Sequence, residues 1–476
     1  MFFDEIHTTF RDPAGSLLKY EGKIFRFINP SYEKEFNELQ ILKGLKKLLE
    51  NNDLSKFKIL KNNELSSLLK DQKFSKIFKK FNSNIVLEHE VMDFVNYPYE
   101  WSNNMLFDAA KLTLHLFENM LSETYGLKDA TPFNIIFENT KPVFVDLLSF
   151  EKRDPLDPIW LGLSQFTKTF LLPLYMNKFA KTPISKSFLS NIDGLNLQDC
   201  LIKTNFFNSL SYSLIKIPNF LSKFTKAKHY KPQKVKNKEF ANFILSKLIK
   251  KLKKRLKLLK PRINKSTWSN YMADQTHYEK SDFSIKEKFI KKILTDSKPK
   301  KVLDIGSNTG HFSILAAQNG AKVISLDNDP MVIDLLYLKA KAKNLNILPM
   351  VVNISRPTPS FGWKNKEYSS FIQRATKSTD LVLMLALIHH MQVSDQIPLL
   401  EIASLAALAT KDGLIIEYID PQDPMFKKIV RGREYLYLDL NIDNFKKTFE
   451  NYFSILDEQK INETRSIFYM RKKQNL

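Results

Sequence analysis

The chain has 476 residues, of which 43% are hydrophobic and 26% are charged. This length exceeds what one core usually organises, and the hydrophobic fraction excludes a disordered chain, so we expect two or more globular domains. The formal net charge of +22 predicts attraction to anions in general, whether nucleic acid, a lipid headgroup surface or a phosphorylated substrate.

The cysteine content and the N-terminal residues bear on the compartment. The single cysteine, Cys200, excludes an internal disulfide framework and a cysteine-rich zinc site and is typical of a reducing compartment. Residues 1–15 are acidic and contain Pro13, so no signal peptide is expected there. No apolar run is long enough to suggest a transmembrane segment. We therefore predict a cytoplasmic protein.

The N-terminal half has a pattern of its own. Residues 10–30 predict a β-hairpin, and residues 86–101 predict a strand followed by a connector. The segment LKDATPFNIIFENTKPVFVDLLSF then contains Asp129, Asn134 and Asp146 in that order. A base, an amide ligand and a metal-binding carboxylate in this order resemble the catalytic segment of protein kinases and small-molecule phosphotransferases.

The resemblance implies an α+β kinase-like domain over residues 1–240, with Asp129 as base and with Asn134 and Asp146 as Mg²⁺ ligands for Mg-ATP. The pattern also departs from kinases, because Asp146 is followed by two leucines and no glycine-rich phosphate loop is present. Lys19 and Lys23 lie near the hairpin, but neither is assigned to phosphate. An active atypical kinase, a degenerate kinase-like binding domain and a chance pattern all stay open.

Two helical regions follow. Residues 160–230 are rich in aromatic side chains and are interpreted as a helical core rather than a lipid or base-stacking platform. Residues 247–262, KLIKKLKKRLKLLKPR, repeat leucine at helical spacing and end near Pro261, and they lie in a predicted basic linker over residues 241–264. We favour a connector helix packed on one side. A surface helix for RNA or for peripheral membrane contact is the alternative.

The C-terminal half, residues 265–476, predicts a domain in which strands and helices alternate. Near-continuous apolar strands separated by helices are typical of an α/β fold with a doubly wound, mostly parallel sheet, whose ligands bind beyond the carboxyl ends of the strands. The expected strands are 301–305, 321–327, 347–354, 379–387 and 412–419, and the expected helices are 309–320, 329–344 and a stretch near 393–410.

The turn after the first of these strands, in VLDIGSNTGHF, is the main candidate for a ligand site. A dinucleotide turn needs glycine at positions that here hold Asn308 and His311, so a pyrophosphate fits poorly. The free N–H groups at the start of the following helix suit a carboxylate, and Asp304 suits an ammonium group. Asp327 ends the second strand, where a ribose-binding carboxylate is expected. Together these features predict S-adenosylmethionine.

Four segments in order, VLDIGSNTGHFSI, VISLDNDP, VVNISRP and DLVLMLALIHHM, resemble the motifs of class I S-adenosylmethionine-dependent methyltransferases. More narrowly, STWSNYMADQTHY and EYIDPQDPMFKKIVRGRE are similar to bacterial methyltransferases related to a nodulation host-specificity protein, a likeness that extends to the N-terminal half. The resemblance implies a Rossmann-like domain that ends in an antiparallel hairpin over 452–459 and 465–472. The cofactor-binding residues it implies are Asp304, Gly306, Ser307, Asn308, Gly310, Asp327, Asn353 and Ile354.

A methyltransferase with a hydroxyl acceptor needs a base, and the candidates near the fourth and fifth strand ends are His389, His390 and Glu417. The alternatives are a structural histidine pair and a Glu417 that pairs with a nearby arginine or lysine such as Arg431 or Arg433. Trp268, Tyr271 and Tyr278 are expected to form a lid or simply to pack.

We predict methyl transfer to a small molecule or a glycan precursor. The competing functions are an atypical small-molecule phosphotransferase, and a nucleic-acid or membrane-binding module with a non-catalytic methyltransferase fold.

Overall fold

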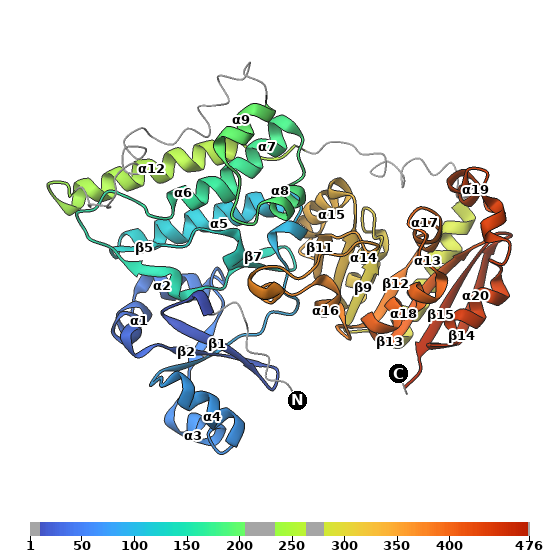
Figure 1. Cartoon of the computed structure of the whole chain (residues 1–476), viewed down its shortest axis with the longest axis horizontal. Helices are drawn as coiled ribbons and strands as arrows, with labels where there is room; N and C mark the ends of the chain where they lie inside the picture. Colours follow the sequence, from blue (N-terminus) through green and yellow to red (C-terminus); the bar gives the residue numbers. More distant parts are fainter. Residues whose placement is uncertain (1–9, 205–233, 263–279, 475–476) are drawn as a thin grey trace. The chain divides into compact units, whose positions relative to one another are not determined.

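The structure, a computed structural model, describes residues 10–204, 234–262 and 280–474 and divides into two compact units (Figure 1). Unit 1 comprises residues 1–99, 103–262 and 362–368, and unit 2 comprises residues 100–102, 263–361 and 369–476. The described part of the predicted linker, residues 241–262, therefore belongs to unit 1. Trp268, Tyr271 and Tyr278 lie outside the described residues.

Unit 1 begins with a four-stranded sheet in the order β1-β2-β4-β3. The hairpin predicted within residues 10–30 is β1 and β2, which pair antiparallel from Gly15 and Ile28 to Tyr20 and Lys23. Aromatic side chains of the sheet and of α4 form its core. The elements are β1 (Gly15–Tyr20), β2 (Lys23–Ile28), α1 (Glu33–Gln40), α2 (Lys43–Glu50), β3 (Phe57–Ile59), α3 (Asn62–Leu68), α4 (Gln72–Phe81) and β4 (Val86–His89).

The rest of unit 1 is mainly helical. The helix α5 (Asn103–Leu121) is buried along most of its length, and the long helix α12 (Lys238–Leu258) packs against it. The described part of the predicted helical core, up to residue 204, is helical and buries aromatic side chains. The remaining elements are β5 (Tyr125–Leu127), β6 (Ile135–Glu138), β7 (Lys141–Phe144), β8 (Phe150–Lys152), α6 (Leu163–Phe166), a π-helical turn (Thr167–Leu171), α7 (Leu172–Ala180), α8 (Ile184–Ser190) and α9 (Leu197–Lys203).

Unit 2 contains a seven-stranded sheet in the order β11-β10-β9-β12-β13-β15-β14. Its strands are parallel except β15, which is antiparallel to both of its neighbours. The predicted mostly parallel α/β fold with a terminal hairpin is thus confirmed. The strands are β9 (Lys301–Ile305), β10 (Lys322–Asp327), β11 (Ile347–Val351), β12 (Thr379–Met384), β13 (Thr410–Ile419), β14 (Phe453–Asn462) and β15 (Arg465–Lys472).

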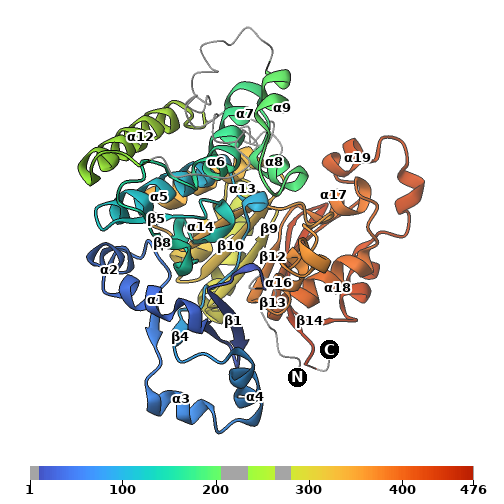
Figure 2. The same cartoon turned by 60° about the vertical axis from the view of Figure 1, so that its left-hand side comes forward.

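Helices cover both faces of this sheet (Figure 2). One face packs its apolar side chains against α13 (Lys280–Ser297), α14 (His311–Gln318) and α15 (Pro330–Ala342). On the other face α18 (Leu399–Ala409) packs against β12 and β13 and contacts α16 (Phe371–Ala375) and α20 (Ile442–Phe449). The sheet is therefore buried on both sides, as its near-continuous apolar strands predict.

The helix expected near 393–410 is α18, which begins later than expected, and a separate short helix, α17 (Ile388–Val393), precedes it. Pro398 caps the start of α18, and a proline disfavours the helical conformation of the residue before it, so one continuous helix cannot form. A further short helix, α19 (Pro424–Val430), follows β13. Among the described residues, no helix combines the length and apolar character needed to cross a lipid bilayer.

Candidate functional site

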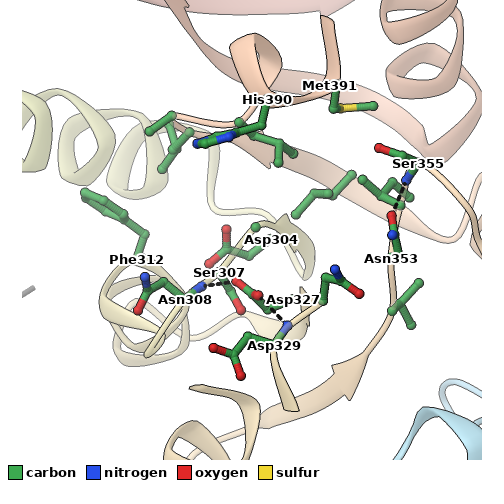
Figure 3. Close-up of a pocket in the computed structure, with 18 of the residues that line it drawn as sticks. Asp304, Ser307, Asn308, Phe312, Asp327, Asp329, Asn353, Ser355, His390 and Met391 are labelled. Carbon is green, nitrogen blue, oxygen red and sulfur yellow. Dashed lines mark hydrogen bonds between the residues drawn. The ribbon is translucent and has the colours of Figure 1, made fainter. Parts of the chain in front are cut away.

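Unit 2 has a cavity of about 580 Å³ at the carboxyl ends of its parallel strands. Strand order reverses between β9 and β12, and a crevice is expected at such a switch point. Figure 3 shows Asp304, Ser307, Asn308 and Asp327 along one side of this pocket, with His390 and Met391 across from them. The predicted cofactor residues therefore meet in one place: seven of the eight line the pocket, and the eighth, Gly310, lies between the lining residues Thr309 and His311.

The turn after β9 is held by backbone geometry that requires glycine. The Gly306 and Ser307 amides both donate to the Leu326 carbonyl, at 2.9 and 2.8 Å, which ties the turn to β10. Gly310 has φ +81°, and a Cβ atom there would lie 2.2 Å from Leu336 Cδ1. A side chain at Gly310 would thus displace both the turn and the packing of α15.

Asp304 and Asp327 are oriented by hydrogen bonds. Asp304 is buried and accepts from Ser313 Oγ at 2.5 Å, and its burial raises its pKa to about 6. Asp327 accepts from the amides of Asn308 and Asp329, both at 2.9 Å, and burial raises its pKa as well. Two carboxyl groups in one buried crevice repel each other, so the pocket favours a ligand that carries positive charge.

The residues present fit S-adenosylmethionine. The cofactor has an ammonium group and a sulfonium, which match the acidic lining. Ser307 Oγ is buried and has no hydrogen-bond partner within the described residues, so the turn leaves a hydroxyl ready for a polar ligand. Asn353 follows β11, and its Oδ1 accepts a hydrogen bond from the Ser355 amide at 2.9 Å. This hydrogen bond fixes the orientation of the Asn353 side chain.

The three predicted bases lie in different surroundings. His390 lines the pocket, whereas His389 and Glu417 are not among its lining residues. The two imidazole rings are 4.2 Å apart. Burial lowers the pKa of His389 to about 3 and also lowers that of His390, although Asp395 opposes the shift at His390. Both rings are therefore neutral at pH 7.

Glu417 belongs to a buried network of charges. Its Oε2 accepts from Lys286 Nζ and, at 2.9 Å, from the Ala386 amide, and its Oε1 lies 3.3 Å from Arg465 Nη1. Arg465 also donates to Asp423 at 2.7 Å. The alternative that Glu417 pairs with an arginine or a lysine is confirmed, but the partners are Lys286 and Arg465 rather than Arg431 or Arg433. Through Ala386, Glu417 holds the turn after β12 that borders the pocket.

Lys286 was not predicted, although it lines the pocket from α13. Its ammonium also lies 5.3 Å from the centre of the Phe312 ring. Phe283 and His311 complete this side of the lining. No sequence signal marks Lys286, because α13 contains several other lysines and only its burial distinguishes Lys286 from them.

Unit 1 contains a second acidic cluster. Arg26 Nη1 lies 3.4 Å from Asp12 Oδ2 and 3.4 Å from Asp146 Oδ1. Ser149 donates to Asp146 and accepts from Asn134 Nδ2 at 3.3 Å. Burial, and then the charge of Asp146, raise the pKa of Asp129. Asp146 thus contacts Arg26, a cation that the sequence analysis did not single out, although it noted Lys19 and Lys23.

No group of three or more histidine, cysteine, aspartate or glutamate side chains suited to a metal ion occurs among the described residues. Mg²⁺ binding by Asn134 and Asp146, with Mg-ATP, stays a prediction.

Comparison with known proteins decides the class of unit 2. Residues 277–457 match the family model described as a methyltransferase domain. Residues 277–457 are therefore a methyltransferase domain, and the chain is an S-adenosylmethionine-dependent methyltransferase. The match spans the whole pocket lining, from Phe283 to Asp395. The recognition made from the four motifs is confirmed.

One relative covers nearly the whole methyltransferase chain. The nodulation protein NoeA of Rhizobium meliloti (strain 1021) is 27% identical over 470 residues, which are 97% of this chain and 94% of that protein. Among solved structures, the bifunctional kinase-methyltransferase WbdD aligns with a TM-score of 0.31 and 16% identity over 44% of each chain. The N-methyltransferase NodS of Bradyrhizobium japonicum WM9 aligns with a TM-score of 0.30 and 12% identity over 41% of this chain and 99% of its own. At these TM-scores neither structure bears on function.

Proposed function

We propose that the chain methylates a polar small molecule or a glycan precursor, bound beside the cofactor in the unit 2 pocket. The supporting observation is that one cavity of about 580 Å³ is lined both by the acids Asp304 and Asp327 and by the polar side chains Arg356, His390 and Asp395. Pockets of about 300–1,000 Å³ accommodate small-molecule ligands. A single space thus offers room for cofactor and acceptor together.

On the cofactor side, Asp304 is assigned to the ammonium group and Asp327 to the ribose hydroxyls. The turn from Gly306 to Gly310 lies under the methionine portion, and Asn353 and Ile354 flank the adenine. Bound S-adenosylmethionine supplies an activated methyl group, so the protein has to align the acceptor and exclude water.

On the acceptor side, the polar groups favour hydroxyl or charged substituents. Arg356 Nη1 and Asp395 Oδ1 form an ion pair at 2.7 Å between the segment after β11 and the segment after α17. An acceptor with hydroxyl or anionic groups can form hydrogen bonds with this pair, whereas an apolar acceptor cannot.

His390 is assigned to proton transfer, because it lines the pocket and is neutral at pH 7. A neutral imidazole can accept the proton of a hydroxyl acceptor, while an amine acceptor needs only to be uncharged. His389 is assigned to supporting the His390 ring, whose centre lies 4.2 Å from its own. Glu417 is assigned to positioning the turn at Ala386 rather than to acting as a base.

The experiment is a metabolite comparison with methyl-labelled methionine. A strain that carries the chain should contain a labelled polar compound that is absent from a deletion strain and from a strain with Asp327→Ala. His390→Ala should reduce the label, while His390→Gln tests whether a hydrogen bond alone is enough. If no labelled compound differs between parent and deletion strains, the proposed reaction is wrong.

A further inference from the structure

The helix α12 has two faces of different character. Its apolar side chains at helical spacing are buried and pack against unit 1, where α5 is the neighbour; they are Ala241, Leu245, Ile249, Leu252 and Leu256. The interpretation as a connector helix packed on one side describes this face. It leaves the opposite face unexplained.

The opposite face is a stripe of lysines with apolar side chains at both ends. At its start Phe240 and Phe243 are 50% and 55% exposed, and at its end Leu258 is 48% exposed. Between them five exposed lysines follow one another at intervals of three, one, three and three residues, which keeps them on one side of a helix. We call this stripe the α12 cationic face; its lysines are Lys247, Lys250, Lys251, Lys254 and Lys257.

The charge of this face is not balanced by its surroundings. The helix contains one acidic residue, Glu239, in its first turn. Lys253, at the edge of the face, pairs with Glu118. Within the described ranges, no acidic side chain pairs with the five lysines of the face, and Lys247 instead lies 5.3 Å from the Phe243 ring centre. The face therefore presents an excess of positive charge to solvent.

We propose that the α12 cationic face binds the surface of an anionic lipid bilayer, with the helix axis lying in the plane of the membrane. A helix of 21 residues is about 30 Å long, so several lipid headgroups lie under it at once. Lysine ammonium groups attract anionic headgroups, and the phenylalanine and leucine side chains enter the apolar region below them.

The same charges could attract nucleic acid, but the composition of the face favours a membrane. The exposed cations of the face are all lysines, because Arg255, the arginine of α12, lies on the buried side of the helix. Exposed apolar side chains at both ends of the stripe gain nothing from a phosphate backbone, whereas a bilayer buries them.

The test is cosedimentation of the full chain with vesicles of phosphatidylcholine alone or with about a third phosphatidylserine. Each lysine near an anionic surface strengthens binding about fivefold, so Lys251→Gln with Lys254→Gln should weaken partitioning roughly 30-fold. The matched control is Lys76→Gln with Lys79→Gln on α4, which removes two exposed lysines at the same spacing and should change partitioning less than twofold.

Phe240→Ser with Phe243→Ser should weaken partitioning at least tenfold and do so at high salt as well, because burial of apolar surface is not screened. Unchanged hydrogen exchange of the α5 and α12 peptides in every variant shows that unit 1 is intact. Equal losses for the α12 and α4 lysine pairs would overturn the proposal. So would binding to single-stranded RNA, but not to vesicles, that depends on Lys251 and Lys254.

Discussion

The charge of Glu417 is predicted to stabilise unit 2 by a large amount. Glu417→Gln keeps the size of the side chain and an acceptor for the Ala386 amide but removes the charge between Lys286 and Arg465. Arg465 still pairs with Asp423, whereas Lys286 loses the carboxylate with which it pairs in the wild type. Removing one partner of a buried ion pair costs about 3–5 kcal/mol in the free energy of unfolding.

Asp412 provides a matched control on the same strand. It pairs with Arg471 of β15 at 3.4 Å, just as Glu417 pairs with Arg465 of β15, but the two side chains of the Asp412 pair are 55% and 56% exposed. Exposed ion pairs contribute about 0–1 kcal/mol, so Asp412→Asn should change stability little. Hydrogen exchange of β13 and β15 peptides measures the difference locally, which matters in a chain with two units.

Two outcomes would refute this reasoning. The first is that Glu417→Gln and Asp412→Asn change the free energy of unfolding equally, within about 1 kcal/mol; the buried network then does not stabilise the unit. The second is that methyl transfer is lost while the exchange rates of both strands are unchanged; Glu417 then acts as a base. Lys286→Met combined with Glu417→Leu replaces the pair with apolar groups and should recover most of the loss.

Three further predictions concern the two sites. Gly310→Ala should destabilise unit 2 and weaken cofactor binding, whereas Gly320→Ala should cost only about 1–2 kcal/mol of backbone strain. Both glycines have positive φ, but only a Cβ atom at Gly310 would meet Leu336. Equal melting temperatures of the two variants would contradict this reasoning. The affinity for S-adenosylmethionine should fall about tenfold from pH 7 to pH 5, because Asp304, with a pKa of about 6, loses its charge as the pH falls. Protonation of Asp304 in this range favours the folded state, so unfolding does not explain the loss of affinity. A calorimetric Kd that does not change between pH 7 and pH 5 would count against the ammonium contact. If Asp146 holds Mg²⁺, Mg-ATP should raise the melting temperature of the wild type and not of Asp146→Ala, and equal shifts would argue against a nucleotide site.

The cofactor turn could be predicted from sequence because its signals are local. A strand that ends in Asp304, two glycines and a helix start lie within one short segment, and Asp327 follows at the end of the next strand. Parallel pairing of β9 and β10 then brings the two acids to one edge of the sheet. The alternation of apolar strands with helices likewise predicts the mostly parallel sheet.

The charged networks could not be predicted, because they depend on burial and on partners far apart in the chain. Lys286 precedes Glu417 by 131 residues, and Arg465 follows it by 48. Arg26 lies between two buried phenylalanines of β2, where a sequence pattern suggests packing rather than an ion pair with Asp146. The sequence pattern therefore does not predict the ion pair between Arg26 and Asp146.

The most direct test of the central claim is calorimetric titration of the full chain with S-adenosylmethionine. We predict one site per chain, at least tenfold weaker binding for Asp327→Ala, and unchanged binding for the exposed control Asp412→Asn. The account is contradicted if the wild type does not bind the cofactor, or if Asp327→Ala binds it as tightly as the wild type does.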